Sequence, residues 1–260
     1  MCRLLGVVAA EPTAFQLALR DAPRSLAHLS KAHPDGWGVA VFDKEWSLQK
    51  GTLCAGEDHA FLEHARTSSG SVLVSHIRAK TVGETAVENT HPFRHGNWIF
   101  AHNGTIQDRD YLKRETPSSE TSWIRGQTDS ELFFAHLISN LRKEGLVDVD
   151  SNDETDRVIS RVVTTARQRE NFGAFSFLLS NGSTTYAHRF GRTLFLLARG
   201  KGDSITPTFD VEAMPARAWV ARRRAILIAS EKLTDEPWEE LSEGTLIRID
   251  RLPTPIWRMI

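Results

Sequence analysis

The chain has 260 residues, 40% of them hydrophobic, which is enough to bury a sizeable core. Its 32 basic and 33 acidic residues give a formal charge of −1, so there is no electrostatic reason to expect nucleic acid or an anionic membrane as a partner. The two cysteines, Cys2 and Cys54, are far apart and have no paired metal-type spacing. This indicates a reducing compartment and no disulfide framework, and we expect the cytoplasm.

The first apolar stretch covers residues 4–10 and is ended by Glu11 and Pro12. It is about half as long as the apolar core of a secretion signal, so it predicts a buried strand. No run approaches the roughly 20 apolar residues that cross a bilayer. We therefore expect no membrane partner.

Short apolar runs, often β-branched and mostly bounded by Gly, Asn, Asp or Ser, predict the strands. They lie at 3–9, 37–43, 71–77, 97–102, 174–180, 184–190, 194–199, 225–230 and 245–250.

Helical spacing of apolar residues predicts the helices between these strands. They cover 13–30, 58–68, 128–144 and 154–170. The third begins with Thr128 and has Glu131 three residues later, the pattern of a capping box. The irregular stretch 200–217 predicts a long surface loop.

Neighbouring strands are joined by hairpin-like turns such as the Asn181-Gly182 pair. Such turns favour antiparallel sheets over a doubly wound parallel sheet. Two sheets with helices packed on their faces would bury this much apolar strand, so the predicted class is α+β. The sequence has no internal repeat and no obvious linker, and we expect a single domain over 1–260.

Cys2 is the first candidate for chemistry, because an initiator Met is commonly removed before a side chain this small. Removal would leave one residue carrying both a thiol and a free α-amine. The unperturbed pKa of such an amine is about 7.7–8.0, so it can act as a general base for its own thiol. The alternative is that Cys2 is a small core residue behind a retained Met1.

Polar segments recur in a fixed order down the chain. They are HPDGWG (33–38), SHIRAKT (75–81), ENTHPF (88–93), AHNG (101–104) and TDSE (128–131), with an MCRLLG start and a late ASEKLTDEPWEELSEG (229–244). Together they resemble the class II glutamine amidotransferases, the N-terminal-nucleophile hydrolases with an N-terminal cysteine, and most closely their small stand-alone members. The resemblance covers essentially the whole chain. It implies a four-layer αββα sandwich and a single type-2 glutamine amidotransferase domain.

The resemblance also assigns substrate contacts. Arg78 matches the arginine that pairs with the substrate α-carboxylate through two parallel hydrogen bonds, and Thr81 matches a residue that helps. Asp129 matches the aspartate that pairs with the α-ammonium. Each has a simpler explanation: Arg78 as a surface arginine in a salt bridge, and Asp129 as an acid favoured by the first turn of a helix.

Asn103 and Gly104 match the two residues that form the oxyanion hole of the family. A side-chain amide and a backbone N–H placed side by side can converge on an oxyanion. The alternative is a type I′ hairpin turn, which Asn-Gly commonly forms. His91 matches a residue that lines the glutamine pocket, and we give it a binding role only.

The HPDGWG segment is expected near the nucleophile, with Gly36 and Gly38 allowing positive φ or close backbone approach. Two positions depart from the fused sugar-phosphate enzymes of the class, which have Trp at the position of Ala79 and His at that of Phe93. Both departures point to the stand-alone branch. The histidines have no convincing metal-type spacing, so no metal or organic cofactor is expected.

The resemblance implies that Cys2 attacks the side-chain amide of glutamine and releases ammonia and glutamate through a γ-glutamyl thioester. Two alternatives remain. The chain could cleave another γ-glutamyl compound, as the resembling hydrolase of ergothioneine biosynthesis does, or it could be a catalytically silent glutamine-binding protein. The partners to consider are the γ-glutamyl substrate, a separate synthase that accepts ammonia, and a second copy of the chain in a homodimer.

Overall fold

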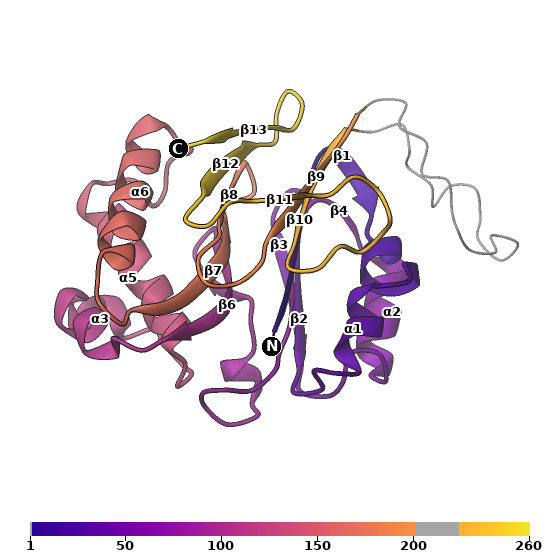
Figure 1. The fold of residues 1–260 in the computed structure, drawn as a ribbon, viewed down its shortest axis with the longest axis horizontal. Coiled ribbons are helices and arrows are strands. Elements are labelled where there is room, and N and C mark those ends of the chain that lie inside the picture. The colour runs from indigo at the N-terminus through magenta and orange to yellow at the C-terminus, as the bar shows by residue number, and fades with distance from the viewer. Residues whose placement is uncertain (1, 201–223) are drawn as a thin grey trace, which may run out of the picture.

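The computed structural model describes residues 2–200 and 224–260. Figure 1 shows two sheets packed face to face, with helices on the outer side of each sheet. Every strand pairing is antiparallel. The predicted α+β class and the αββα layering are therefore confirmed. The loop expected over 200–217 lies, apart from residue 200, outside the described residues.

One sheet has seven strands in the order β11-β9-β10-β1-β4-β2-β3. Its strands are β1 (Arg3–Ala14), β2 (Trp37–Phe42), β3 (Trp46–Gly51), β4 (Ser69–Ile77), β9 (Phe195–Arg199), β10 (Ala225–Ala229) and β11 (Glu239–Glu240). Its outer face carries η1 (Leu17–Asp21), α1 (Leu26–Ser30) and α2 (His59–Thr67), as Figure 1 shows on the right.

The other sheet has six strands in the order β13-β12-β8-β7-β6-β5. Its strands are β5 (Phe93–His95), β6 (Trp98–Ile106), β7 (Gly173–Ser180), β8 (Thr184–His188), β12 (Leu246–Asp250) and β13 (Ile256–Met259). The associated helices are α3 (Arg109–Glu115), α4 (Ser118–Thr121), α5 (Asp129–Lys143) and α6 (Asp153–Arg167), while the one-turn η2 (Val87–Asn89) lies in the loop before β5. Among the helices in the described ranges, none is long and apolar enough to cross a membrane.

The core forms three apolar layers, and β1 shows why. Leu4 and Val8 belong to the layer between the two sheets, whereas Leu5 and Val7 pack toward the helices outside. This alternation follows from the two-residue period of a strand. A third layer joins α5 and α6 to the six-stranded sheet through a cluster of phenylalanines that includes Phe133 and Phe134. Both faces of the two sheets are therefore covered.

The predicted helix over 13–30 is wrong over its first residues and in the middle. Thr13 and Ala14 still pair with β4, opposite Gly70 and Ser69, so β1 runs further than its apolar run suggested. The five-residue π-helix η1 follows, and Pro23 separates it from α1, whose N-cap is Ser25. A proline cannot supply the N–H that a continuous helix requires there.

The other predicted helices are confirmed as α2, α5 and α6. The strands β3, β5, β11 and β13 and the short helices α3 and α4 were not predicted, since their apolar runs are brief or interrupted. The Asn181-Gly182 turn between β7 and β8 is confirmed, with Gly182 at φ +90° and the Asn181 side chain accepting from Thr184 N at 2.9 Å.

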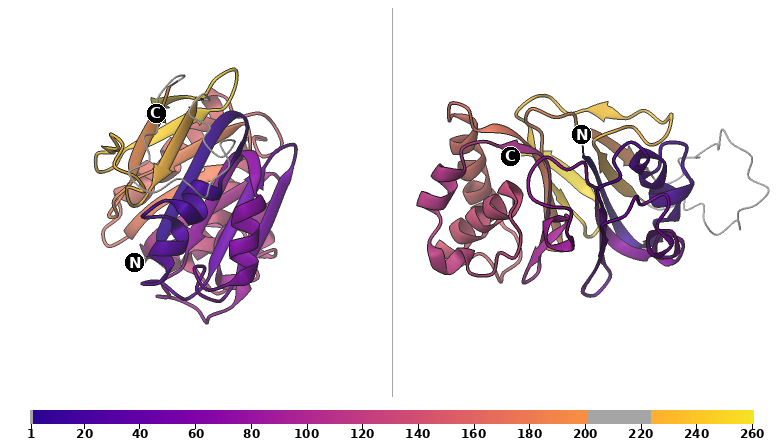
Figure 2. Two further views of the ribbon diagram at one scale, coloured as in Figure 1. Left: turned by 90° about the vertical axis from the view of Figure 1, so that its right-hand side faces the viewer. Right: turned by 90° about the horizontal axis from the view of Figure 1, so that it is seen from below.

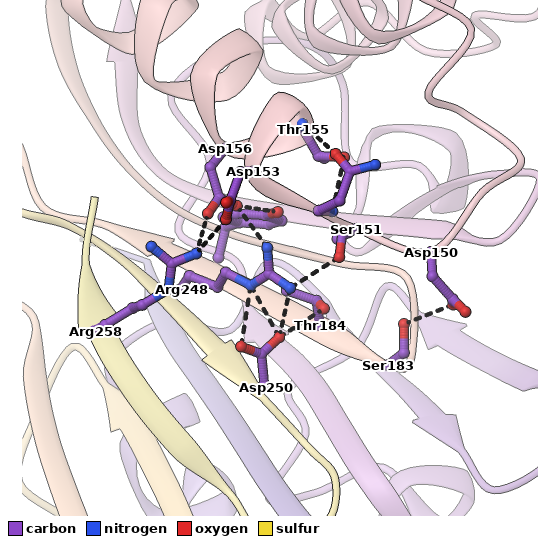
Figure 3. A network of polar contacts seen from close by, with 12 residues as sticks. Asp150, Ser151, Asp153, Thr155, Asp156, Ser183, Thr184, Arg248, Asp250 and Arg258 are labelled. Atoms are coloured by element: carbon purple, nitrogen blue, oxygen red, sulfur yellow. Dashed lines mark hydrogen bonds and ion pairs between the residues drawn. The ribbon is translucent and has the colours of Figure 1, made fainter.

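A buried polar network fastens α6 to the six-stranded sheet (Figure 3). Asp156 accepts hydrogen bonds from Tyr186 at 2.8 Å and Arg248 at 3.0 Å through one oxygen, and from Arg258 at 2.6 Å through the other. Arg248 also bonds Asp250 and the carbonyl of Ser151. The Asp156 carboxylate therefore holds three partners from β8, β12 and β13.

Replacing Asp156 by alanine should lower the free energy of unfolding by about 3–5 kcal/mol, because the buried Arg248 loses one of its two counter-charges and the buried Tyr186 hydroxyl loses its acceptor. Urea unfolding at neutral pH measures the change. The control is Asp153→Ala. The Asp153 side chain also pairs with Arg258 but is 80% exposed, so its removal should cost less than about 1 kcal/mol. Equal losses in the two variants would contradict this account of the network.

Candidate active site

Cys2 lies directly before β1, next to the end of β4. Because Arg3 pairs with Ile77, Cys2 falls beside Arg78 and Ala79, and its Sγ is 3.3 Å from both the N and the O of Ala79. Leu4, two residues later, packs between the sheets. Strand alternation turns the Cys2 side chain the same way, and Figures 1 and 2 show this end of the chain between the two sheets.

A pocket with about 310 Å³ of empty space, part of it open to solvent, borders Cys2. It is lined by Cys2, His76, Arg78, Ala79, Thr81, Val82, Asn89, His91, His102, Gly104, Thr128, Asp129 and Ser130. Six of the seven predicted site residues are therefore brought together. The seventh, Asn103, is buried next to Gly104 but does not line the pocket in this structure.

Arg78 is not the surface arginine of the simpler explanation, since its exposure is only 4%. Its guanidinium donates to the carbonyls of Glu84 and Val82, each at 2.9 Å, and thereby shapes the loop that follows β4. Burial lowers its pKa, while Cys2 and Asp35 act in the opposite direction. Arg78 thus brings positive charge to the pocket beside the Cys2 sulfur.

Asp129 is the first residue of α5, but the cap of that helix is Thr128, whose hydroxyl accepts from Glu131 N at 3.2 Å. The Asp129 carboxylate reaches back to β6, where one oxygen accepts from Ile106 N at 2.6 Å. Its other oxygen makes no hydrogen bond within the described residues, so the Asp129 carboxylate can bind β6 and a ligand at the same time. The Glu131 carboxylate accepts from the backbone N–H groups of Arg125 and Gly126 and not from that of Thr128. The predicted capping box is therefore only half formed.

Asn103 and Gly104 lie inside β6 and not in a hairpin turn, so that alternative is wrong. Gly104 has φ +155°, and a Cβ there would lie 2.0 Å from the carbonyl oxygen of Ala174 on β7. The Asn103 side chain makes no hydrogen bond to any described residue. It is therefore available as a donor.

Three imidazoles adjoin the pocket: His76 on β4, His91 before β5 and His102 on β6. Burial lowers the pKa of all three, that of His76 to about 3. They are therefore neutral at physiological pH. Burial likewise raises the pKa of the Cys2 thiol, against the Ala79 backbone and the Arg78 charge, so the free thiol needs a base to become a nucleophile.

The HPDGWG segment supports this end of the site. The Asp35 carboxylate accepts from Lys80 N at 2.8 Å, and Gly36 has φ +128°. A Cβ at Gly38 would lie 2.0 Å from the carbonyl oxygen of His91, so the expected close backbone approach is confirmed. Gly38 thereby lets the segment carrying His91 lie directly on β2.

Seven pocket residues were not assigned to the site from the sequence, and these include four polar residues, His76, Asn89, His102 and Ser130. Asn89 joins two loops, since it accepts from Gln127 N at 2.7 Å and donates to Glu84 O at 3.1 Å. All four stand inside or next to the quoted motifs, which was the available signal. No group of three or more His, Cys, Asp or Glu side chains within the described ranges could hold a metal ion.

A family model described as "Glutamine amidotransferases class-II" matches residues 1–251. The chain belongs to the class II glutamine amidotransferases. That the chain is a small stand-alone member of this family remains a prediction from the sequence.

A putative glutamine amidotransferase of Haemophilus influenzae is 32% identical over 199 residues, which are 72% of this chain and 63% of that protein. The chain thus spans less than two thirds of this relative. The gamma-glutamyl-hercynylcysteine sulfoxide hydrolase of Mycobacterium tuberculosis H37Rv is 30% identical over 219 residues, 78% of this chain and 82% of that one. A crystal structure of a predicted glutamine amidotransferase from Pseudomonas aeruginosa matches with a TM-score of 0.65 at 23% identity, covering 97% and 98% of the two chains. That match shows the same fold.

Replacing Gly104 by alanine should destabilise this amidotransferase by at least about 2 kcal/mol, because the new Cβ strikes the Ala174 carbonyl at a strained φ. Thermal and urea unfolding measure the loss. The control is Gly145→Ala, also at positive φ (+71°) but with nothing within 4 Å of the new Cβ, and it should cost about 1 kcal/mol. If the two variants lost the same stability, the packing of Gly104 on β7 would not matter.

Proposed function

We propose that the protein is a glutaminase-type amide hydrolase whose nucleophile is Cys2, after removal of Met1. The observation that carries the proposal is the pocket that unites Cys2, Arg78, Asp129 and Gly104. These four supply a thiol, a guanidinium, a carboxylate and a backbone N–H. Glutamine presents the matching electrophile, α-carboxylate, α-ammonium and developing oxyanion.

In the proposed cycle the α-amine of Cys2 accepts the thiol proton, and the thiolate attacks the side-chain carbonyl carbon of glutamine. Asn103 and Gly104 donate to the resulting oxyanion. Arg78 and Thr81 bind the α-carboxylate, Asp129 binds the α-ammonium, and His91 lines the pocket. The C–N bond then breaks, ammonia leaves with the proton held by the amine, and water hydrolyses the γ-glutamyl thioester to glutamate. The cycle requires no cofactor.

The need for the amine follows from the environment of the thiol. Its raised pKa keeps it protonated near neutral pH, and within the described residues none of the three neighbouring imidazoles is hydrogen-bonded to Sγ. Its partners in the described residues are the N and O of Ala79. A base on the same residue is always within reach, whereas a histidine would have to move.

The second candidate is hydrolysis of a larger γ-glutamyl compound, favoured by the 30% identity to the gamma-glutamyl-hercynylcysteine sulfoxide hydrolase. The same residues would then act on the γ-glutamyl half, and an amine would leave in place of ammonia. If glutamine is the substrate, the released ammonia passes to a separate synthase in the cytoplasm. Residues 1–260 then act as one domain. The third candidate is a catalytically silent glutamine-binding protein, in which a retained Met1 blocks the α-amine of Cys2.

The intact mass of the purified protein and its release of glutamate from glutamine test the proposal together. We expect a mass without Met1 and steady glutamate release, both in the wild type and in Cys54→Ala, which removes a buried thiol outside the pocket. Cys2→Ala should lose turnover at unchanged thermal stability. Glutamate release by Cys2→Ala at the wild-type rate would refute the mechanism. A trimmed chain inactive on glutamine but active on another γ-glutamyl compound would select the second candidate.

A further inference from the structure

The start of β1 is tied to the segment that follows β10. Leu4 N donates to the Ser230 hydroxyl at 3.0 Å, and Ser230 N donates to the Leu4 carbonyl at 3.0 Å. Ser230 belongs to the late ASEKLTDEPWEELSEG segment (229–244), which contributes no residue to the pocket. The two bonds bring the next residue of that segment, Glu231, beside the first residue of β1, Arg3.

Arg3 connects this segment to Cys2. Its Nη2 pairs with the Glu231 carboxylate at 2.8 Å, and its Nη1 donates to the carbonyl oxygen of Cys2 at 3.1 Å. The Arg3 side chain is only 15% exposed, so water and salt screen its charge weakly. Among the described residues, Arg3 is the one charged side chain that is hydrogen-bonded to Cys2.

The bond from Arg3 helps to fix the direction of the Cys2 α-nitrogen. The pairing of β1 with β4 begins at Arg3, so the strand ladder itself does not hold Cys2. Its Sγ is held by the N and O of Ala79, each at 3.3 Å, and its carbonyl is held by Arg3. The sulfur and the carbonyl belong to two of the three heavy-atom substituents of Cα, whose bond angles are fixed. Holding these two sets the direction of the third, which is the nitrogen.

The same bond brings a positive charge close to that nitrogen. The α-nitrogen and the carbonyl oxygen of one residue are at most about 3.6 Å apart, so Nη1 of Arg3 lies within about 7 Å of the Cys2 nitrogen. A cation at this distance disfavours the protonated form of an amine. The charge of Arg3 therefore favours the free base.

Other titratable groups face this end of the chain from three elements. They are Arg78 at the end of β4, His33 and Asp35 before β2, and Glu231 after β10. Burial lowers the pKa of His33 to about 4, so that imidazole is neutral at pH 7. Asp35 and Glu231 oppose the two arginines. Arg3 differs from the other three charges because it is bonded to Cys2 itself.

We propose that Arg3, held by Glu231, is a positioning residue for the α-amine of Cys2, which it aims by binding the carbonyl and keeps unprotonated by its charge. An unperturbed N-terminal amine, with a pKa of about 7.7–8.0, is mostly protonated at pH 7 and is then no base. The use of this amine in catalysis rests on the proposed function. The effect of Arg3 on the amine does not, so the two can fail separately.

The pH dependence of kcat/KM for glutamine tests the role in catalysis, because its acid limb reports the base of the free enzyme. Arg3→Gln removes the charge and keeps an N–H donor, and it should move the acid limb to higher pH by about one unit. Arg3→Lys keeps the charge and should stay close to the wild type. Glu231→Gln leaves the arginine without its counter-charge and should move the limb to lower pH.

The matched control is Arg24→Gln. Arg24 also binds the segment after β10, through the Lys232 carbonyl at 2.7 Å and Asp235 at 2.8 Å, but it does not bind Cys2. This variant should leave the acid limb in place. A merely structural ion pair would make Arg3→Gln and Glu231→Gln alike, since both break it. Shifts of the same sign in these two variants, or an unmoved limb in Arg3→Gln, would overturn the proposal.

The amine itself is titrated without turnover in Cys2→Ala protein, released from a fusion by a protease that leaves residue 2 as the first residue. Trace acetylation by acetic anhydride at a series of pH values, read by mass on the N-terminal peptide, gives the pKa of the α-amine. We expect a higher pKa when Arg3→Gln is added and a lower one with Glu231→Gln. Equal values in all three proteins would overturn the inference. Shifts as expected, together with a kcat/KM profile that does not follow the amine, would uphold the effect of Arg3 on the amine and refute the proposed mechanism.

Discussion

β1 is hydrogen-bonded on both sides, to β10 along Leu5–Ala9 and to β4 along Arg3–Val8, and the site depends on this double pairing. A central strand cannot slip by one residue without turning every side chain to the opposite face. The register that buries Leu4 between the sheets therefore also sets Cys2 beside the end of β4. A residue so near a chain terminus would ordinarily be mobile, and here the sheet itself fixes the position of the proposed nucleophile.

The second sheet completes the site from the other side of the interior. β6 contributes Gly104 and the N–H of Ile106, and that N–H binds Asp129 at the start of α5. The loop after β4 closes the pocket through Arg78 and Asn89. The candidate site is thus divided between two sheets, and the packing of one sheet on the other, rather than any single loop, sets the distances within it. Burial then keeps the thiol and the imidazoles neutral until a proton is moved.

Most of the fold could be predicted because segments such as 71–77 and 225–230 are short apolar runs rich in β-branched residues, which favour strands. The helix predicted over 13–30 failed because sheet pairing with Gly70 overrode a helical apolar spacing, and Pro23 then divided what remained. For the candidate site, the motifs predicted Cys2, Arg78 and Asp129, whose charges or position mark them, and the structure places all three around one pocket. The motifs contain His76 and Asn89 but do not single them out, because these side chains bond residues distant in the sequence, which only the tertiary structure brings together.

The central claim is that Cys2, as the first residue of the mature chain, carries the acyl group during turnover. The most direct measurement is rapid acid quenching of the enzyme during turnover of glutamine, followed by peptide mass mapping. We expect a γ-glutamyl thioester on the N-terminal peptide, on Cys2 and without Met1. Turnover with an acyl group on another residue, or with no acyl group on Cys2 at any quench time, would contradict the account.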